Sequence, residues 1–455
     1  RHAFGSDDFY STYNAVDGTT DNVGYLGYGH YREADGFREA NSDYDVTAAG
    51  IKLVLDASEQ TRWTIVGDYY DEEHGEPGGL SLKTGDGIAN YNQNRNATTR
   101  FFDRFELERN SASVAMDHDL SDDTLIQVKP WYTFYSRYSQ RQRGGGFGTL
   151  PTGPDANSNT IELQEFDTSA IEARARHGWF AWDEEHTLTL GTMYYYVDSF
   201  RTEKRGATPD ARDGRVRSDA DRTVHYAPVF LENRFVFGDL SVTPGFRLEN
   251  VWQEVTEKVN VSKTAEGTPL GDKDDHDTVP LFGLGTAWKV QPEVELYANV
   301  SQSYRPKLYT ETVPTGGTTL VPEDLDPSDI VQYDLGARGQ LGSSLVWDAS
   351  VFQMDIDDQI GTVALDGGQS TLGNVGDARH RGIEAALELD VSSLLDDLNS
   401  SSIKEEIGTF SVFGNATLLD AEFTAGPNDG NTPQYAPDYI VRTGVRYAFD
   451  DRIQI

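Results

Sequence analysis

The sequence predicts an all-β protein, a transmembrane antiparallel β-barrel, and three observations support this fold class. Apolar and polar residues alternate along most of the chain, with the period of two that a strand imposes on its two faces. The alternating segments are longer than the strands of ordinary globular proteins. Short and long connections between the segments follow each other in turn, as they do at the two rims of an outer-membrane barrel.

The alternation is clearest in four segments. In residues 240–248 the apolar residues and Pro244 occupy the even positions, and in residues 294–301 the even positions are again apolar. Residues 383–389 and 409–418 show a similar pattern. A segment of this kind has one apolar and one polar face as a strand, whereas an amphipathic helix would repeat its apolar residues every three or four positions.

Several segments are unusually long. The β-type pattern persists over residues 21–36, 124–142, 186–205 and 238–258, whereas a strand in a globular protein has about 5–6 residues. Strands of this length suit a wall that crosses a bilayer and continues beyond it.

Turn-forming residues divide the chain into about 17 segments. We place them at residues 3–16, 21–36, 43–56, 61–74, 98–118, 124–142, 161–180, 186–205, 222–237, 239–258, 276–290, 293–311, 329–341, 344–363, 371–392, 406–424 and 435–455. An odd number of antiparallel strands cannot close an up-and-down barrel, because the first and last would run parallel and leave open edges in lipid. We therefore expect further strands outside this sequence.

The connections and the aromatic residues fit the same architecture. Short connections fall at residues 121–123, 182–185, 238–239 and 291–292, and long polar ones at residues 75–96, 144–160, 206–221, 265–276 and 314–328. Aromatic residues such as those at 69–70, 131–132, 179–180, 194–196 and 288 lie toward the ends of segments, as expected at a membrane–water interface. The alternative is that these rings belong to the core of a large soluble β-protein.

Composition excludes several functions. The chain has 455 residues with no Cys, which excludes disulfide scaffolds and thiolate metal sites. It has 38 Lys and Arg against 75 Asp and Glu, a formal charge of −37, and this field repels nucleic acid. The acidity is consistent with a salt-adapted surface, or with acidic outer loops that bind divalent cations beside lipopolysaccharide.

Arginine clusters are the candidate ligand-binding residues, because Arg offers a bidentate fork to carboxylates and other anions. The first cluster consists of Arg137, Arg141 and Arg143, together with Tyr138 and Gln140. The second consists of Arg201 and Arg205, followed by further Arg residues at positions 212, 215 and 217. Both are predicted on the side of the long connections, where a ligand would arrive. The alternative is that these cations only neutralise acidic residues of the loops.

The sequence gives little support for a metal-binding or catalytic site. The nine His residues show no ligand spacing. The segment Asp355–Asp358 lacks the glycine of a calcium loop, so we interpret it as a strand end. The loop Asp272–Asp277 is predicted to be a solvated charge run, with Ca²⁺ binding as the alternative. No nucleophile elbow is present, and the glycines of 144–148 are not followed by a helix that could cradle phosphate. We predict no enzyme activity, no metal ligand and no cofactor.

Four stretches, in order, resemble the TonB-dependent outer-membrane receptors, more narrowly the ferric-citrate and ferric-siderophore type. They are Tyr28-Gly29-His30 with Asp35–Arg38, Ser42-Asp43-Tyr44 and Glu76-Pro77-Gly78-Gly79-Leu80; Leu296–Ser301 with Tyr304-Arg305-Pro306 and Leu325-Asp326-Pro327; Asn374-Val375-Gly376 with Arg381–Glu384; and Pro433–Phe449.

The resemblance implies a barrel of 22 strands, so that residues 1–455 would be a partial barrel without its last strands. No plug domain, TonB box or terminal aromatic residue is found in this sequence. The implied function is uptake of a ferric chelate, such as ferric citrate or a ferric siderophore, across the bacterial outer membrane, energised by the TonB-ExbB-ExbD complex acting through the plug. The alternatives are a passive pore or structural barrel, uptake of cobalamin or a glycan, and a soluble carbohydrate-binding or hydrolytic protein.

Overall fold

The computed structural model describes residues 1–85, 87–267, 269–307, 319–320, 325–364, 370–399, 402–449 and 453–454. Within these ranges the protein is all-β with three short α-helices and one 3-10 helix. The fold class predicted from the sequence is therefore confirmed. In the described part of the chain, no helix is long and apolar enough to span a bilayer.

Twenty-three strands are present among the described residues. They are β1 (His2–Phe4), β2 (Tyr10–Thr20), β3 (Val23–Ala34), β4 (Tyr44–Ser58), β5 (Thr61–Gly75), β6 (Arg104–Ser121), β7 (Thr124–Gln142), β8 (Asn159–Ala181), β9 (Glu184–Gly206), β10 (Arg215–Tyr226), β11 (Val229–Phe237), β12 (Leu240–Asn260), β13 (Asp272–Gln291), β14 (Val294–Arg305), β15 (Thr319–Leu320), β16 (Ser328–Leu341), β17 (Leu345–Asp357), β18 (Ile360–Ala364), β19 (Ser370–Asn374), β20 (Ala378–Asp390), β21 (Thr409–Phe423), β22 (Tyr439–Phe449) and β23 (Ile453–Gln454). The helices are η1 (Pro154–Asn157), α1 (Val261–Glu266), α3 (Val391–Asn399) and α4 (Ile403–Ile407).

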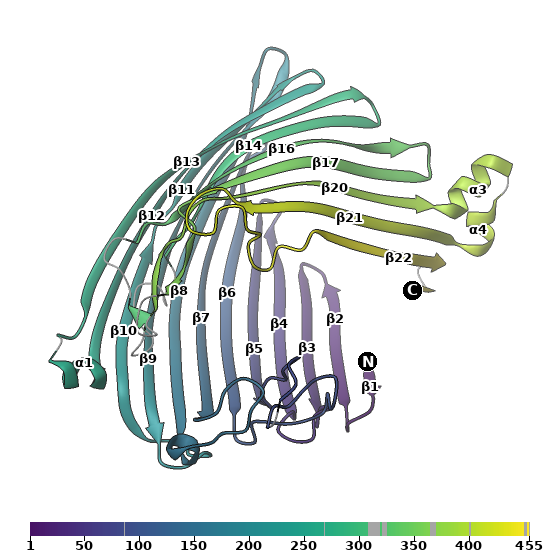
Figure 1. The fold of residues 1–455 in the computed structure, drawn as a ribbon. Coiled ribbons are helices and arrows are strands. Elements are labelled where there is room, and N and C mark those ends of the chain that lie inside the picture. Colours follow the sequence, from purple (N-terminus) through teal and green to yellow (C-terminus); the bar gives the residue numbers. More distant parts are fainter. Residues whose placement is uncertain are drawn as a thin grey trace. The chain divides into compact units, whose positions relative to one another are not determined.

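The chain forms two compact units. Unit 1 comprises Arg1–Arg176, Leu190–Val229 and Glu249–Thr278. In it, β1 to β7 pair antiparallel in chain order, and β10 pairs antiparallel with both β9 and β12. Strands β2 to β7 lie side by side in Figure 1. Because each strand pairs with the next along the chain, every second connection of β2–β7 falls at the same end of the sheet.

Unit 2 comprises His177–Thr189, Phe230–Leu248 and Val279–Ile455. Its main sheet is antiparallel in the order β13, β14, β16, β17, β20, β21, β22 and β23. The short strands β15, β18 and β19 form a separate small sheet, in which β15 and β19 are parallel.

The two faces of the unit 2 sheet differ in chemistry. Leu335 of β16, Val351 of β17, Ile383 of β20 and Leu418 of β21 are direct cross-strand neighbours on one face, and all four are exposed. The opposite face carries acidic and basic residues such as Glu295. In a soluble protein an apolar row of this kind would be buried, so its exposure is what a lipid-facing wall requires. We call these the apolar face and the polar face.

Most of the predicted segments match observed strands, and each of the 17 contains at least one strand. The differences have physical reasons. The predicted strand 222–237 is two strands, β10 and β11, because Pro228 between them has no N–H to donate to a neighbour. The first strand of any length begins at Tyr10 rather than at residue 3. The run Asp272–Asp277 is not a loop but the start of β13.

Helices replace one of the short turns in unit 2. β20 and β21 are joined by α3 and α4, which the sequence analysis did not predict. Ser392 of α3 accepts a hydrogen bond from the Phe410 N–H, at 3.0 Å, and Lys404 of α4 forms an ion pair with Asp390, at 2.8 Å. These contacts hold the two helices against the ends of the strands they connect (Figure 1).

Candidate functional site

The long connections of unit 1 are tied to one another at the end of its sheet. Arg38, in the connection from β3 to β4, donates from Nε to the Ala97 carbonyl at 2.7 Å and from Nη2 to the Gly78 carbonyl at 3.1 Å. The Asn41 amide donates to the carbonyls of Glu76 (3.2 Å), Arg100 (3.1 Å) and Asp103 (2.8 Å). The side chains of Arg38 and Asn41, both between β3 and β4, therefore hold the connection 76–103 in place.

The segment Pro77-Gly78-Gly79 passes very close to its neighbours. Gly78 has a φ of +82°, and a Cβ placed there would lie 2.2 Å from Oγ1 of the buried Thr99. A Cβ on Gly79 would lie 2.2 Å from the ring of Phe147. The two glycines noted in the sequence are therefore required by positive φ at one position and by close approach at both.

A cavity of about 700 Å³ lies between these connections. It is lined by His74, Gly75, Glu76, Pro77, Gly78, Gly79, Thr99, Arg100, Asp103, Arg141, Gly146, Phe147 and Gly148. The lining combines charged side chains with glycine-rich loops, and Arg100 and Arg141 provide cations to an entering ligand. All of these residues belong to unit 1.

Asp103 is the buried acid of this cavity, with 6% of its surface exposed. Burial raises the pKa of its carboxyl group to about 6, although the Gln142 N–H donates to Oδ1 at 2.6 Å and Nε of Arg100 lies 3.9 Å from Oδ2. Desolvation disfavours the charged carboxylate more strongly than these two partners favour it. The carboxyl group of Asp103 therefore titrates close to neutral pH.

The two arginines of the cavity have different surroundings. Arg100 donates from Nη1 to the Thr149 carbonyl at 2.6 Å and from Nη2 to the Gly146 carbonyl at 3.3 Å, so its guanidinium holds the loop after β7. Arg141 forms an ion pair with Glu76 at 3.1 Å, and half of its side chain remains exposed. Arg141 is therefore the cation that a ligand in the cavity reaches most directly.

The predicted site residues of β7 separate onto two faces. Arg137 and Arg141 lie on one face, where the Arg137 guanidinium stacks on the Phe105 ring at 5.0 Å. Tyr138 and Gln140 point to the opposite face, since successive residues of a strand alternate. Tyr138 contacts Arg212 there, and Gln140 donates to the Phe102 carbonyl at 2.8 Å.

The remaining predicted residues lie at the same end of unit 1. Arg143 forms an ion pair with Asp155 at 2.6 Å, and Arg205 lies within electrostatic range of Arg143 and Asp155. Arg201 pairs with Glu162 at 2.9 Å, and both side chains are mostly buried. The structure thus brings one member of each predicted Arg cluster together, but Arg201 is already neutralised by its partner.

Two rings in contact show that Arg201 and Arg205 share a face with Arg137. Trp131 of β7 contacts Tyr195 of β9, with ring centroids 5.6 Å apart. Trp131 and Arg137 are an even number of positions apart in β7, so they lie on the same face of that strand. For the same reason Tyr195, Arg201 and Arg205 lie on one face of β9. The arginines of both strands therefore project from one side of the sheet.

Arg38, Arg100 and Asp103 were not predicted as site residues from the sequence. Arg100 and Asp103 were assigned to a strand at 98–118, whereas β6 begins at Arg104 and both residues belong to the preceding connection. The sequence Pro77-Gly78-Gly79 indicates a tight turn in this part of the chain, but it does not indicate which later residues pack on that turn.

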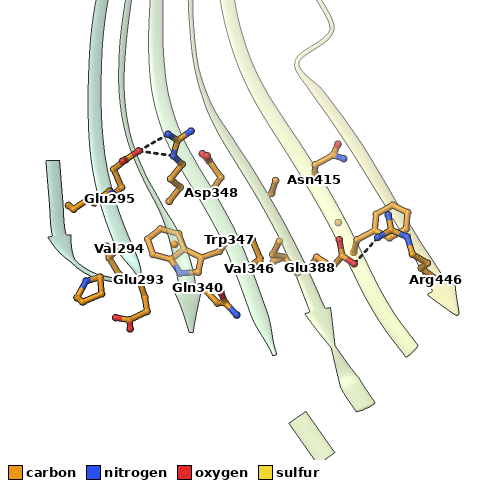
Figure 2. Close-up of a pocket in the computed structure, with 18 residues that line it drawn as sticks. Glu293, Val294, Glu295, Gln340, Val346, Trp347, Asp348, Glu388, Asn415 and Arg446 are labelled. Atoms are coloured by element: carbon orange, nitrogen blue, oxygen red, sulfur yellow. Dashed lines mark hydrogen bonds and ion pairs between the residues drawn. The ribbon is translucent and has the colours of Figure 1, made fainter. Parts of the chain in front are cut away.

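A second cavity, of about 670 Å³, lies in unit 2 near the short turns, and the sequence analysis did not predict it. Figure 2 shows two ion pairs in its wall: Arg338 donates to Glu295 at 2.9 and 2.6 Å, and Arg446 pairs with Glu388 at 3.0 Å. Beside the first pair, the Tyr297 hydroxyl donates to Asp348 at 2.8 Å. Each of the two guanidinium groups has its own carboxylate here.

No cluster of three or more His, Asp or Glu residues suited to a metal ion is found within the described ranges. Asp355 is the third residue from the end of β17 and pairs with Arg379 at 2.8 Å, which agrees with its interpretation as a strand end.

Long antiparallel strands, short turns at one end, long connections at the other and an exposed apolar face define the wall of a transmembrane β-barrel. The profile of the family described as TonB dependent receptor-like, beta-barrel, matches residues 2–453. The chain belongs to this family. Its members are Gram-negative outer-membrane transporters rather than enzymes.

Solved structures with this fold include three informative examples. The ferric citrate transporter FecA in the unliganded form has a TM-score of 0.78 and 20% identity, with 97% of this chain and 61% of FecA covered. The siderophore receptor PiuA from Acinetobacter baumannii has a TM-score of 0.78 and 13% identity, covering 98% and 68%. The copper transporter OprC has a TM-score of 0.73 and 14% identity, covering 98% and 65%. The chain thus spans only about three fifths of FecA.

Proposed function

We propose that this chain is the wall of an energy-coupled outer-membrane receptor that takes up a ferric chelate, such as ferric citrate or a ferric siderophore. Family membership supports the transport class, and the neighbours named for ferric citrate and siderophores support iron as the cargo. In this proposal residues 1–455 are a partial barrel, and the TonB-ExbB-ExbD complex supplies energy through a plug domain.

The observation that carries the proposal is the loop cavity of unit 1. Ferric citrate and many ferric siderophores are anionic or rich in oxygen, and Arg141 projects into the cavity with half of its side chain exposed. Arg205 lies near the Arg143–Asp155 ion pair at the same end of the sheet. Arg137 and Arg201 project from the face that continues from this end, whereas Tyr138 and Gln140 serve in packing on the other face.

The test is a binding titration of the full-length receptor with ferric citrate and with a catecholate siderophore. Replacing Arg137, Arg141 and Arg143 together by Ala should weaken binding of the preferred chelate at least about tenfold, since charge-assisted hydrogen bonds to the anion are lost. The matched control removes Arg338 and Arg446 of the unit 2 cavity and should leave affinity unchanged. Unchanged affinity in the triple variant would reject the cluster.

A further inference from the structure

The unit 1 sheet has an apolar side and an opposite side that carries arginines and tyrosines. Ile65 of β5 and Val114 of β6 are direct cross-strand neighbours, and both are exposed on the apolar side. Tyr70 lies five positions after Ile65, so it projects from the opposite side. Arg109 lies five positions before Val114 and projects from that opposite side as well. With the apolar side in lipid, the side of Tyr70 and Arg109 lines the lumen.

Two arginines on the lumen side are each held by an aromatic ring. The Arg109 guanidinium lies over the Tyr70 ring, 5.7 Å from its centroid. The Arg137 guanidinium lies over the Phe105 ring at 5.0 Å. Such a contact occupies one face of the guanidinium and uses none of its five N–H groups. The edge that forms bidentate hydrogen bonds with a carboxylate is therefore left open.

These two arginines have no counter-ion within the described ranges. Neither Arg109 nor Arg137 forms an ion pair there, and Nε of Arg137 is buried without a hydrogen-bond partner. Arg338 of unit 2 shows the contrast. It also lies over a ring, that of Tyr297 at 5.5 Å, but it donates two hydrogen bonds to Glu295. In a chain with 75 Asp and Glu residues, two neighbouring arginines without a carboxylate partner are therefore a specific feature of this wall.

Strand register places the two arginines close together and next to the loop cavity of unit 1. Arg109 is the cross-strand neighbour of Tyr135, and Arg137 lies two positions further along β7. Diagonal neighbours of this kind are about 7–8 Å apart, so one ligand with two carboxylates reaches both side chains. Arg141, which lines the loop cavity, is four positions after Arg137 on the same side of β7. The pair is therefore the next cationic position along the wall from that cavity.

The charge around the pair is positive. Two carboxylates project from the same side in the neighbouring rows of β3 to β7, and both already accept hydrogen bonds. Glu72 accepts one from the hydroxyl of Tyr70, and Asp68 accepts one from the hydroxyl of Tyr28 at 3.1 Å. Arg32, four positions after Tyr28 in β3, adds a third guanidinium to this side. Three cations thus face two carboxylates here, although the chain as a whole has a formal charge of −37.

We propose that Arg109 and Arg137 form a carboxylate site for the transported chelate, so that the cargo is a ferric polycarboxylate rather than a neutral hydroxamate or a catecholate. Each guanidinium edge binds one carboxylate of the chelate, and the rings of Tyr70 and Phe105 fix the orientation of the two edges. The inference rests on the proposed uptake function and adds the chemical class of the cargo.

Geometry favours a carboxylate over the other common iron-chelating groups. A neutral hydroxamate chelate offers no anionic group to the guanidinium edges. A catecholate chelate presents aromatic rings, which attract the face of a guanidinium, and Tyr70 and Phe105 already stack on these two arginines. A carboxylate matches the open edge in both charge and geometry.

Titration of the full-length receptor with three ferric chelates tests the proposal. The probes are ferric citrate, which carries carboxylates, ferrichrome, which is a neutral hydroxamate, and ferric enterobactin, which is a catecholate. We expect ferric citrate to bind at least about tenfold more tightly than the other two, because only its carboxylates pair with both guanidinium edges.

Two variants and a control localise the site. Arg109→Lys keeps the positive charge but loses the planar fork, and it should weaken ferric citrate binding about tenfold. Arg137→Lys should act in the same direction. The matched control is Arg338→Lys, which changes an arginine that also stacks on a tyrosine but is already paired with Glu295. It should change the affinity less than twofold, and heat-dependent gel mobility reports the folding of every variant.

Two results would overturn the proposal: tighter binding of ferrichrome or ferric enterobactin than of ferric citrate, or ferric citrate affinity that is unchanged in both variants. Lower thermal stability of these variants with unchanged affinity would show that the guanidinium groups pair with another part of the protein. Magnesium citrate serves as an iron-free probe. If no ferric chelate binds while magnesium citrate binds and is weakened by Arg109→Lys, the proposed iron uptake is wrong and the carboxylate site stands.

Discussion

The two polar cavities of this chain are similar in size but are built differently. The cavity of unit 2 is made by strand side chains: the register of β14 and β16 places Glu295 opposite Arg338, and Arg446 of β22 reaches Glu388 of β20 across β21. The cavity of unit 1 lies where connections pack on the ends of β5 and β7, with a buried acid, two glycines at close approach and Arg141 of β7, which is paired with Glu76. Arginine is paired with a carboxylate in both cavities, so the cavity of unit 1 is distinguished by its buried acid and its closely packed glycines and not by an unpaired cation.

The largest effect is expected from Gly78→Val, which places a branched side chain at a φ of +82° and against the buried Thr99. The strain and overpacking should cost about 3 kcal/mol of local stability and open the connection 76–103. Hydrogen exchange of residues 76–103 should rise, and chelate affinity should fall. The control is Gly29→Ala on β3, where a new Cβ meets nothing within 4 Å. Exchange that stays protected in the Gly78→Val variant would contradict this account of the cavity.

The next effect separates the cavities by the position of their arginines. Arg141→Ala should weaken chelate binding about tenfold, since it removes a cation from the proposed ligand cavity, whereas Arg338→Ala in unit 2 should change it less than twofold. Equilibrium titration of both variants with the same chelate measures the difference. If the two substitutions weaken binding equally, the chelate does not bind specifically in the cavity of unit 1.

A smaller effect concerns the pH dependence of stability. The pKa of Asp103 is about 6 in the folded chain and about 3.9 in an unfolded one. Between these pH values the Asp103 carboxyl group therefore binds more protons in the folded chain than in the unfolded one. The stabilisation that comes from protonation of Asp103 is complete below pH 4 and is lost as the pH rises through 6. Asp103→Asn should be more stable than the natural chain at pH 7 by about 1 kcal/mol, after allowance for solvent screening, with no gain at pH 3.5. Thermal unfolding at both pH values measures this, and a gain that is constant with pH would contradict it.

The smallest effect is expected in the wall of unit 2. A double-mutant cycle on Glu295 and Arg338 should give a coupling free energy of about 0.5 kcal/mol, because the Arg338 side chain is largely exposed. Denaturant unfolding of the two single variants and the double variant gives this value. A coupling several times larger would mean that the cavity of unit 2 is organised by its ion pairs rather than by register alone.

Strands could be predicted from this sequence more fully than the connections. A period of two is set by the backbone of each strand, so residues 124–142 were predicted with the bounds that β7 has. Pro228 shows the limit of that reasoning, because its missing N–H interrupts pairing without changing the apolar pattern. In α3 the apolar residues Val391, Leu394, Leu395 and Leu398 do follow a helical period, but over only nine residues, and α4 has five.

The candidate site could be predicted only in part. Grouping Arg137 to Arg143 by sequence proximity placed Tyr138 and Gln140 in one cluster with Arg141, although alternation sends them to opposite faces. The roles of Asp103 and Arg38 depend on contacts with residues about 40 to 60 positions away, such as the hydrogen bond from the Gln142 N–H to Asp103. Such contacts are set by how the connections fold over one another, and no local pattern records them.

The amide of Asn41 makes the loop end of unit 1 sensitive to a single chemical change. Its nitrogen faces three carbonyl oxygens, at the beginning and the end of the connection 76–103. Hydrolysis of that amide to a carboxylate would turn a shared donor into an acceptor pointed at three acceptors, and the connection would come loose at both ends. Deamidation of Asn41 would then disorder the connection 76–103 first, while the strands that it joins stay paired.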